Sequence, residues 1–211
     1  MSPQSPPRGE LARRLQGLNL YLVGMMGAGK SAAGRPLAEA LGYRFLDADQ
    51  VLEQAAGQSI PTLFEEQGEA GFRDLETAVL DRIAGWHSLV VATGGGVVTR
   101  PRNWGHLHQG VVIWLDAPAA LLLRRLRADP TPRPLLACAD PSARLDSLLS
   151  QRRPLYAQAD LAVMQGEGDD PGTVAERVLE ALPTILRERA RAPEEAVTLL
   201  DGDGNLTRSL N

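Results

Sequence analysis

Short apolar runs alternate with longer segments of helical character along most of the chain. The apolar runs, which predict buried strands, lie at 19–23, 43–46, 88–92, 110–115 and 161–164. Predicted helices lie at 30–41, 50–56, 60–67, 69–84, 117–127, 142–159 and 171–190. Pro36 and Pro183 predict distortions inside two of these helices, and Pro154 predicts a break in a third. Strands that alternate with helices predict an α/β fold of three layers, with a five-stranded parallel sheet and helices on both faces.

The predicted elements fall within residues 18–190, a length that suits a single domain. Residues 1–17 are expected to form a flexible extension, in which Leu11 to Leu15 could make a short helix. Residues 191–211 are polar and rich in Gly and Asp, and they are expected to form a flexible tail. Residues 128–140 are rich in Pro and Asp, which predicts a mobile loop between two helices.

Composition narrows the class of protein. A chain of 211 residues with 44% hydrophobic residues can bury a sizeable core, and a net charge of -4 does not favour nucleic acid as a partner. The single cysteine, Cys138, excludes an internal disulfide and suits a reducing compartment. The first ten residues lack the apolar run of a secretory signal, and no apolar run is long enough to span a bilayer. These features predict a soluble cytoplasmic protein.

A glycine-rich segment follows the first predicted strand and leads into a helix. Residues 24–31 match the pattern G-x-x-x-x-G-K-[ST] completely. Glycines allow backbone N–H groups to turn inward around phosphates, and the helix that begins at Lys30 adds the positive end of its dipole. Lys30 is expected to reach the β- and γ-phosphates, and Ser31 to hold Mg²⁺. A chance match in a Gly-rich turn is the alternative, but the strand before and the helix after argue against it.

Lys30 is the only lysine among the 22 lysine and arginine residues of the chain. The bias toward arginine elsewhere carries no functional information. A lysine retained at this one position is informative, because its ammonium is a compact point charge whereas the arginine guanidinium is a broad planar fork. The phosphate loop is therefore expected to require the compact charge.

Polar or glycine-rich segments also follow the second and third predicted strands. Asp47 and Asp49 come after the second strand, and Thr93 is followed by Gly94, Gly95 and Gly96 after the third. Ligands of parallel sheets bind outside the carboxyl ends of the strands, so these segments should meet the phosphate loop at one edge. The two carboxylates could hold the water shell of a metal and accept a proton from an attacking hydroxyl. Alternatively, Asp49 could cap the next helix, and the glycines could be a simple turn.

Three arginines are further candidates for phosphate or carboxylate binding. Arg133 lies in the Pro-rich loop, where closure over the phosphates would neutralise developing charge and exclude water. Arg73 and Arg152 offer forks that suit a carboxylate or phosphate on an acceptor, although most arginines are simply solvated. The histidines at 87, 106 and 108 lack the spacing of a zinc site, and no Ser-His-Asp or Cys-His pattern is present.

The ordered set of motifs resembles the shikimate kinase family over about residues 18–185. The matching segments are Gly27-Ala28-Gly29-Lys30-Ser31, Asp47-Ala48-Asp49, Ser59-Ile60-Pro61 to Phe64, Gly68-Glu69, Phe72-Arg73-Asp74-Leu75-Glu76, Gly94-Gly95-Gly96, Arg133-Pro134-Leu135-Leu136 and Arg152-Arg153-Pro154-Leu155-Tyr156. The resemblance implies transfer of the γ-phosphate of ATP to the 3-hydroxyl of shikimate, in the biosynthesis of aromatic amino acids. It also implies a fold of the nucleoside-monophosphate-kinase type, with a lid near 128–140 and a substrate-binding region near 48–78.

The resemblance assigns a role to each candidate residue. Asp49 would bind the shikimate hydroxyls and orient or deprotonate the nucleophile, and Lys30 and Arg133 would stabilise the transferring phosphoryl group. The implied shikimate-binding residues are Asp49, Arg73, Gly94, Gly95, Gly96 and Arg152. The implied ATP-binding residues are Gly27, Ala28, Gly29, Lys30, Ser31, Ala32, Arg125, Arg133 and Pro171, and Arg125 and Pro171 would sandwich adenine. Ser31 and Asp47, the latter through water, would hold Mg²⁺.

The sequence departs from the family pattern at one position of the phosphate loop, and two other classes of protein are alternatives. Ala32 replaces the hydroxyl or β-branched residue that usually follows the P-loop serine, so a side-chain contact to the α-phosphate is absent. A gluconate-kinase-like or nucleotide kinase is an alternative, although Arg73 and Arg152 argue against its different acceptor. A non-catalytic nucleotide-binding protein is another, although it would be expected to lose Lys30 or Asp49. No macromolecular partner is expected, and the chain is expected to be a monomer.

Overall fold

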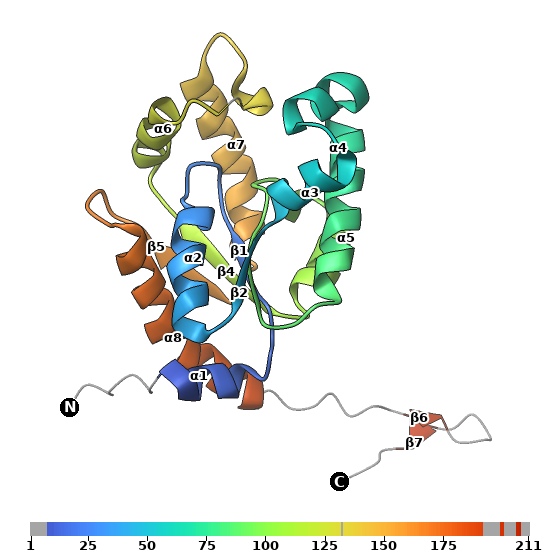
Figure 1. The fold of residues 1–211 in the computed structure, drawn as a ribbon, viewed down its shortest axis with the longest axis vertical. Coiled ribbons are helices and arrows are strands. Elements are labelled where there is room, and N and C mark those ends of the chain that lie inside the picture. The colour runs from blue at the N-terminus through green and yellow to red at the C-terminus, as the bar shows by residue number, and fades with distance from the viewer. Residues whose placement is uncertain (1–7, 132, 192–198, 201–205, 208–211) are drawn as a thin grey trace.

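The computed structural model describes residues 8–131, 133–191, 199–200 and 206–207. Five strands form one parallel sheet in the order β2-β3-β1-β4-β5, as predicted. The strands are β1 (Leu20–Val23), β2 (Arg44–Asp47), β3 (Leu89–Ala92), β4 (Val111–Asp116) and β5 (Leu161–Met164). The main helices are α1 (Arg8–Leu15), α2 (Lys30–Leu41), α3 (Ala48–Ala56), α4 (Ile60–Ala84), α5 (Pro101–Leu107), α6 (Ala119–Ala128), α7 (Pro141–Tyr156) and α8 (Pro171–Arg191). Figure 1 shows helices on both sides of the sheet.

The central strand β1 is buried on both of its faces. Leu20 and Leu22 pack into one apolar cluster with α2 and α8, whereas Tyr21 and Val23 pack into a second cluster with α4 and α5. Successive side chains of a strand point to opposite faces, so a run of four apolar residues can supply both layers. This burial explains why the strand has no polar residue and why the sheet carries helices on both faces.

The amino-terminal helix departs from the flexible extension expected for residues 1–17. Leu11 and Leu15 are buried in the cluster that α2 and α8 share, and α1 contacts both helices. Arg14 also donates a hydrogen bond of 3.3 Å to the carbonyl of Pro183 in α8. Two leucines four positions apart lie on one face of a helix, which gives α1 an apolar side to bury. Residues 1–7 lie outside the described residues.

Several helices differ in detail from the prediction. The expected helices 60–67 and 69–84 form one element, α4, with a kink at Gly68, whose φ of 68° a glycine adopts readily. α2 continues through Pro36, and α7 continues through Pro154 to Tyr156. The seven-residue helix α5 was not predicted, because it is too short to show a helical period.

The carboxyl-terminal segment is described only in part. Strands β6 (Leu199–Leu200) and β7 (Leu206–Thr207) pair antiparallel within the range expected to be a flexible tail. The rest of residues 192–211 lies outside the described part of the chain. Among the helices that the structure describes, none has the length and apolarity needed to cross a bilayer.

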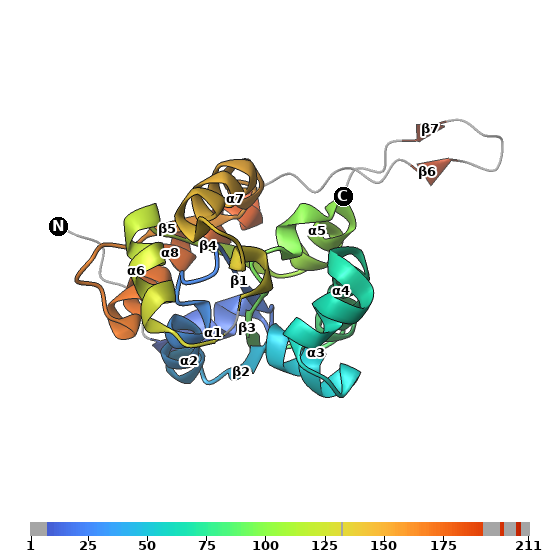
Figure 2. The same ribbon diagram turned by 90° about the horizontal axis from the view of Figure 1, so that it is seen from above.

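The carboxyl ends of β1, β2 and β3 meet at one edge of the sheet. β1 leads into the loop at 24–29, β2 into α3, and β3 into the glycines at 94–96. In Figure 2, which looks onto this edge, α6 and α7 lie on one side of it and α3 and α4 on the other. The predicted convergence of the three segments is therefore confirmed, and it places them between two helical flanks.

Candidate active site

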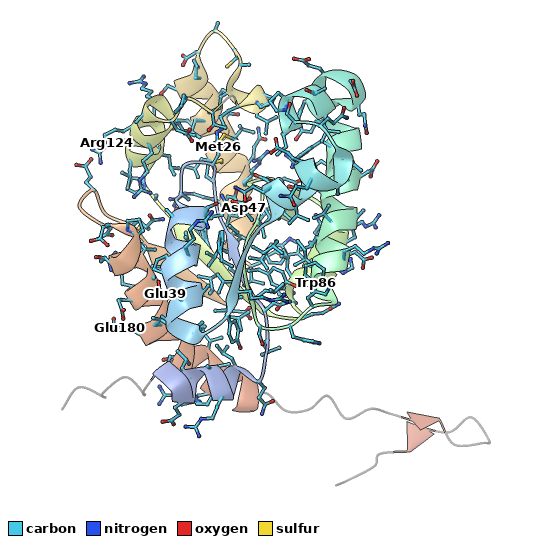
Figure 3. The ribbon with its side chains drawn as sticks, viewed as in Figure 1. Met26, Glu39, Asp47, Trp86, Arg124 and Glu180 are labelled. Atoms are coloured by element: carbon cyan, nitrogen blue, oxygen red, sulfur yellow. The ribbon has the colours of Figure 1, made fainter. Side chains whose placement is uncertain are left out.

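Two adjoining cavities, of about 300 and 600 Å³, occupy this edge of the sheet. The smaller one is lined by the phosphate loop, with Gly27, Gly29, Lys30 and Ala32, and by Arg125. The larger one is lined by residues of α3 and α4, by the three glycines and by Arg152. Both cavities share the lining residues Met26, Ser31, Asp47, Asp49, Gly95 and Arg133. Figure 3 labels two of these, Met26 at the tip of the loop and Asp47 at the end of β2.

The phosphate loop is shaped by glycines with left-handed backbones. Gly24, Gly27 and Gly29 have φ values of 142°, 80° and 75°, which other residues rarely adopt. Nζ of Lys30 donates hydrogen bonds to the carbonyls of Gly24 at 2.8 Å and of Met25 at 3.1 Å. Burial lowers the pKa of Lys30 to about 8, against the opposing effect of the nearby carboxylates. The ammonium is thus held in the loop at the place where phosphates would bind.

Asp47 links the phosphate loop to β2 and α3. Its Oδ2 accepts a hydrogen bond of 2.5 Å from Oγ of Ser31. Its Oδ1 accepts hydrogen bonds from the backbone N–H groups of Asp49 and Gln50, at 3.1 and 3.4 Å, and so caps α3. The alternative in which Asp49 caps this helix is therefore wrong, since Asp47 does so.

The carboxylate of Asp49 lies at the junction of the two cavities. Burial raises the pKa of Asp49 first, and the neighbouring Asp47 raises it further, whereas Lys30, Arg133 and Arg73 lower it. A carboxylate of raised basicity beside an ammonium can orient a hydroxyl and receive its proton. The sequence also placed Asp49 at this edge of the sheet, and its role there stays a prediction.

The donor set around Ser31 suits a hard divalent cation. Its hydroxyl and the Asp47 carboxylate lie side by side, and oxygen ligands of this kind are those that Mg²⁺ prefers. Mg²⁺ usually takes one or two protein carboxylates and completes its shell with water and substrate phosphates. The residues present therefore fit Mg²⁺ bound together with a nucleotide.

Each of the three glycines after β3 faces a different wall of the site. A Cβ on Gly94 would lie 2.5 Å from Glu76 and 2.9 Å from Asp49, and one on Gly95 would lie 3.2 Å from the backbone nitrogen of Met26. A Cβ on Gly96 would lie 2.1 Å from the guanidinium of Arg73. A side chain on Gly94 or Gly96 would displace Glu76, Asp49 or Arg73, so these two positions need glycine for close approach as well as for the turn.

Two buried arginines line the larger cavity. Arg73, 5% exposed, pairs with Glu76 at 2.9 Å and with Glu69 at 3.1 Å. Arg152, 4% exposed, donates to the carbonyl of Gly95 at 3.2 Å. Nε of Arg73 and Oε1 of Glu76 are buried without a protein partner, and such atoms usually bond to a ligand or water. Sequence reasoning missed Glu76 as a site residue, although its place three residues after Arg73 on a helix was a usable signal.

The remaining candidates lie at the nucleotide side. Arg133 lines both cavities and pairs with Asp129 at 2.6 Å, and its Nε is buried without a protein partner. Arg125 donates to the carbonyl of Gly27 at 3.3 Å and to Oε1 of Gln165 at 3.0 Å. The side chain of Ala28 is buried behind the loop. Pro171 is exposed at the start of α8 and does not line either cavity.

A phosphate loop after the central strand of such a sheet, beside a second cavity lined by buried arginines, defines the class of P-loop kinases that act on small molecules. The model of the family described as shikimate kinase matches residues 26–183. The chain belongs to the shikimate kinase family.

Individual relatives agree with this assignment. The shikimate kinase of Synechococcus sp. strain RCC307 is 60% identical over 187 residues, which cover 89% of this chain and 95% of the relative. The solved structure of the Acinetobacter baumannii shikimate kinase in complex with shikimate is 39% identical, with a TM-score of 0.78 over 82% of this chain and 97% of that one. A gluconokinase from Sinorhizobium meliloti, 18% identical with a TM-score of 0.53 over 84% of this chain and 98% of that one, shares the fold alone.

Proposed function

We propose that this protein uses ATP and Mg²⁺ to phosphorylate the 3-hydroxyl of shikimate, giving shikimate 3-phosphate and ADP. The single observation that carries the proposal is the junction of the two cavities. Asp49, Lys30 and Arg133 gather where a triphosphate in the loop would meet an acceptor held by the arginines. Residues of the nucleotide site and residues of the acceptor site thus share one reacting centre.

The acceptor side suits a small polyhydroxylated carboxylic acid. Arg73 and Arg152 provide two buried guanidinium groups for a carboxylate, and such pairs form strong charge-assisted hydrogen bonds. Asp49 and the backbone of residues 94–96 provide hydrogen-bond partners for hydroxyl groups. Shikimate carries one carboxylate and three hydroxyls, which matches this set of groups.

The reaction follows from the groups at the junction. Asp49 orients the acceptor hydroxyl, whose oxygen forms a bond to the γ-phosphorus, and receives its proton. The bond from this phosphorus to the β,γ-bridging oxygen breaks, and ADP leaves with that electron pair. Lys30 and Arg133 stabilise the charge on the transferring phosphoryl group. Ser31 and Asp47 would hold Mg²⁺, which would supply positive charge to neutralise the phosphate oxygens.

The proposal extends to the organisation of the chain. The kinase domain comprises residues 18–190 together with α1, which packs into the same core, with a lid at about 128–140 and a substrate-binding region at about 48–78. Gly27 to Ala32 hold the phosphates of ATP, and Arg125 and Pro171 contact its adenine. The enzyme works in the cytoplasm as a monomer and acts on ATP and shikimate, without nucleic acid or a membrane as a partner.

A coupled assay for ADP release with a panel of acceptors tests this proposal. Shikimate should give Mg²⁺-dependent turnover, whereas gluconate and nucleoside monophosphates should give no more than the rate without an acceptor. Turnover on gluconate or on a nucleotide, without turnover on shikimate, would exclude the proposed substrate. ATP turnover that no acceptor stimulates would favour a nucleotide-binding protein of another kind.

A further inference from the structure

The carbonyl of Gly95 receives two hydrogen bonds from α7. Nη1 of Arg152 donates to it at 3.2 Å, and the hydroxyl of Tyr156 donates to it as well. These two residues are four positions apart and therefore lie on the same face of the helix. The described part of the chain contains no cis peptide bond, and in a planar trans peptide the N–H points opposite to the C=O. Fixing the Gly95 carbonyl against α7 thus directs the N–H of Gly96 away from α7.

Tyr156 is held rigidly in this position. Its side chain is 0% exposed, and its ring stacks on Trp114 with the ring centres 5.9 Å apart and 25° between the planes. The guanidinium of Arg153 lies 5.7 Å from the centre of the Trp114 ring and is bonded to both oxygens of Asp116, at 2.8 and 3.0 Å. Burial raises the pKa of Tyr156 to about 12 despite the neighbouring Arg152, so the hydroxyl keeps its proton and remains a donor at neutral pH.

The peptide group between Gly95 and Gly96, whose carbonyl Tyr156 anchors, lies between the guanidinium groups of Arg73 and Arg152. Cα of Gly96 faces Arg73, because a Cβ there would lie 2.1 Å from Nη2 of that residue. Arg152 bonds to the carbonyl at the other side of the same peptide. Gly96 and Arg73 both line the larger cavity, so an anionic group bound there by Arg73 would lie near the N–H of Gly96.

We propose that Tyr156 is a positioning residue of the acceptor site, which presents the N–H of Gly96 to the carboxylate of the acceptor by anchoring the carbonyl of Gly95. This inference rests on the proposed function, because that function supplies the carboxylate. Tyr156 does not touch the acceptor itself. Its effect reaches the substrate through one peptide group, so it should change the binding of the acceptor and leave that of ATP unchanged.

Tyr156→Phe tests this role, because it removes the hydroxyl and keeps the ring on Trp114. Loss of one hydrogen bond should raise the KM for shikimate about 5-fold, while kcat and the KM for ATP stay within about 2-fold. Tyr21→Phe is the matched control. Tyr21 is also fully buried, but its hydroxyl lies near Asn19, at the opposite end of β1, and bonds to that side chain at 3.4 Å. The control should leave both KM values unchanged, even where the melting temperature falls.

An acceptor in which the carboxylate of shikimate is reduced to an alcohol separates positioning from general loosening of the site. With this analogue, wild type and Tyr156→Phe should have about the same kcat/KM, because the anionic partner of the Gly96 N–H is gone. An unchanged KM for shikimate in Tyr156→Phe, or equal increases of both KM values, overturns this inference alone. A wild-type chain without turnover on shikimate overturns the proposed function, and this inference with it.

Discussion

The hydroxyl of Ser31 donates a hydrogen bond of 2.5 Å to the carboxylate of Asp47, and this contact joins the phosphate loop to the end of β2. The second oxygen of the same carboxylate caps α3, the helix that carries Asp49. Asp47 therefore connects Ser31, with which it is proposed to bind the metal, to Asp49, which is proposed to receive the proton. Its charge and its capping role can be separated, because asparagine caps helices about as well as aspartate.

Asp47→Asn should weaken the use of Mg²⁺ without unfolding the protein. The amide oxygen can still cap α3, but the negative charge near the proposed cation is lost. We expect the Mg²⁺ concentration for half-maximal activity to rise about 10-fold, as for other groups that act on a metal through its water ligands. A titration of activity with Mg²⁺ at saturating ATP, together with the melting temperature, measures this. An unchanged Mg²⁺ requirement would leave Asp47 with the capping role only.

Asp49→Asn should reduce kcat about 10²-fold or more, because the amide cannot receive the proton. The KM for ATP should change by less than about 3-fold. The raised pKa of Asp49 means that the folded state binds this proton more tightly than the unfolded state does, so the ionised carboxylate opposes folding at neutral pH. The variant should therefore melt at or above the wild-type temperature at pH 7, and the gain should shrink as the pH falls toward the ordinary value of an aspartate. Loss of ATP binding in parallel with kcat would instead make Asp49 a structural residue.

The affinity for ATP should fall as the pH rises through about 8. The ammonium of Lys30 attracts phosphate, and in the unliganded site its pKa is lowered to about 8, so the charge is lost above that pH. The dissociation constant for ATP, measured by calorimetry from pH 6.5 to 9.5, should therefore rise with an inflection near this value. In Asp49→Asn the inflection should move to lower pH, because the carboxylate that most raises the pKa of Lys30 is gone. A flat profile in both proteins would contradict this assignment.

Gly96→Ala should damage the acceptor site selectively. The new Cβ would overlap the guanidinium of Arg73, and overpacking of this kind costs about 1–3 kcal/mol. The KM for shikimate should rise at least about 5-fold, and the KM for ATP should stay near the wild-type value. Gly105→Ala is the control, since a Cβ on Gly105 in α5 meets nothing within 4 Å. This control should leave the kinetics unchanged and stabilise the helix by about 0.5–1 kcal/mol.

Leu15→Ala should destabilise the domain without affecting catalysis. Leu15 is fully buried, and truncation of a buried leucine to alanine costs about 2–5 kcal/mol. Urea unfolding should show this loss, whereas both KM values should stay the same because α1 lies far from the cavities. Glu10→Ala changes an exposed residue of the same helix and should cost less than about 0.5 kcal/mol. A loss below 1 kcal/mol for Leu15→Ala would mean that α1 is only loosely attached.

The parts of the molecule that the sequence predicted correctly are those determined by local pattern. The loop at 24–31 has a fixed spacing between its glycines, lysine and serine, and the order of strands and helices placed it at the same edge as Asp49 and Gly95. Burial of α1 could not be predicted, because Leu11 and Leu15 become core residues only where α2 and α8 form a surface for them. The role of Tyr156 was hidden for the same reason, since its partner Gly95 lies 61 positions away in the chain.

The lone lysine in the phosphate loop has a consequence for chemical modification. Lys30 carries the only side-chain amine of the protein, and it lies in the phosphate loop with a pKa low enough to leave part of it uncharged and nucleophilic near pH 8. Lysine is also the residue that cells acetylate, methylate and ubiquitinate. Any such attachment to a lysine of this protein would fall on the ammonium that is proposed to bind the phosphates of ATP. Amine-reactive reagents would therefore report the occupancy of the nucleotide site directly, because bound ATP would shield their only side-chain target.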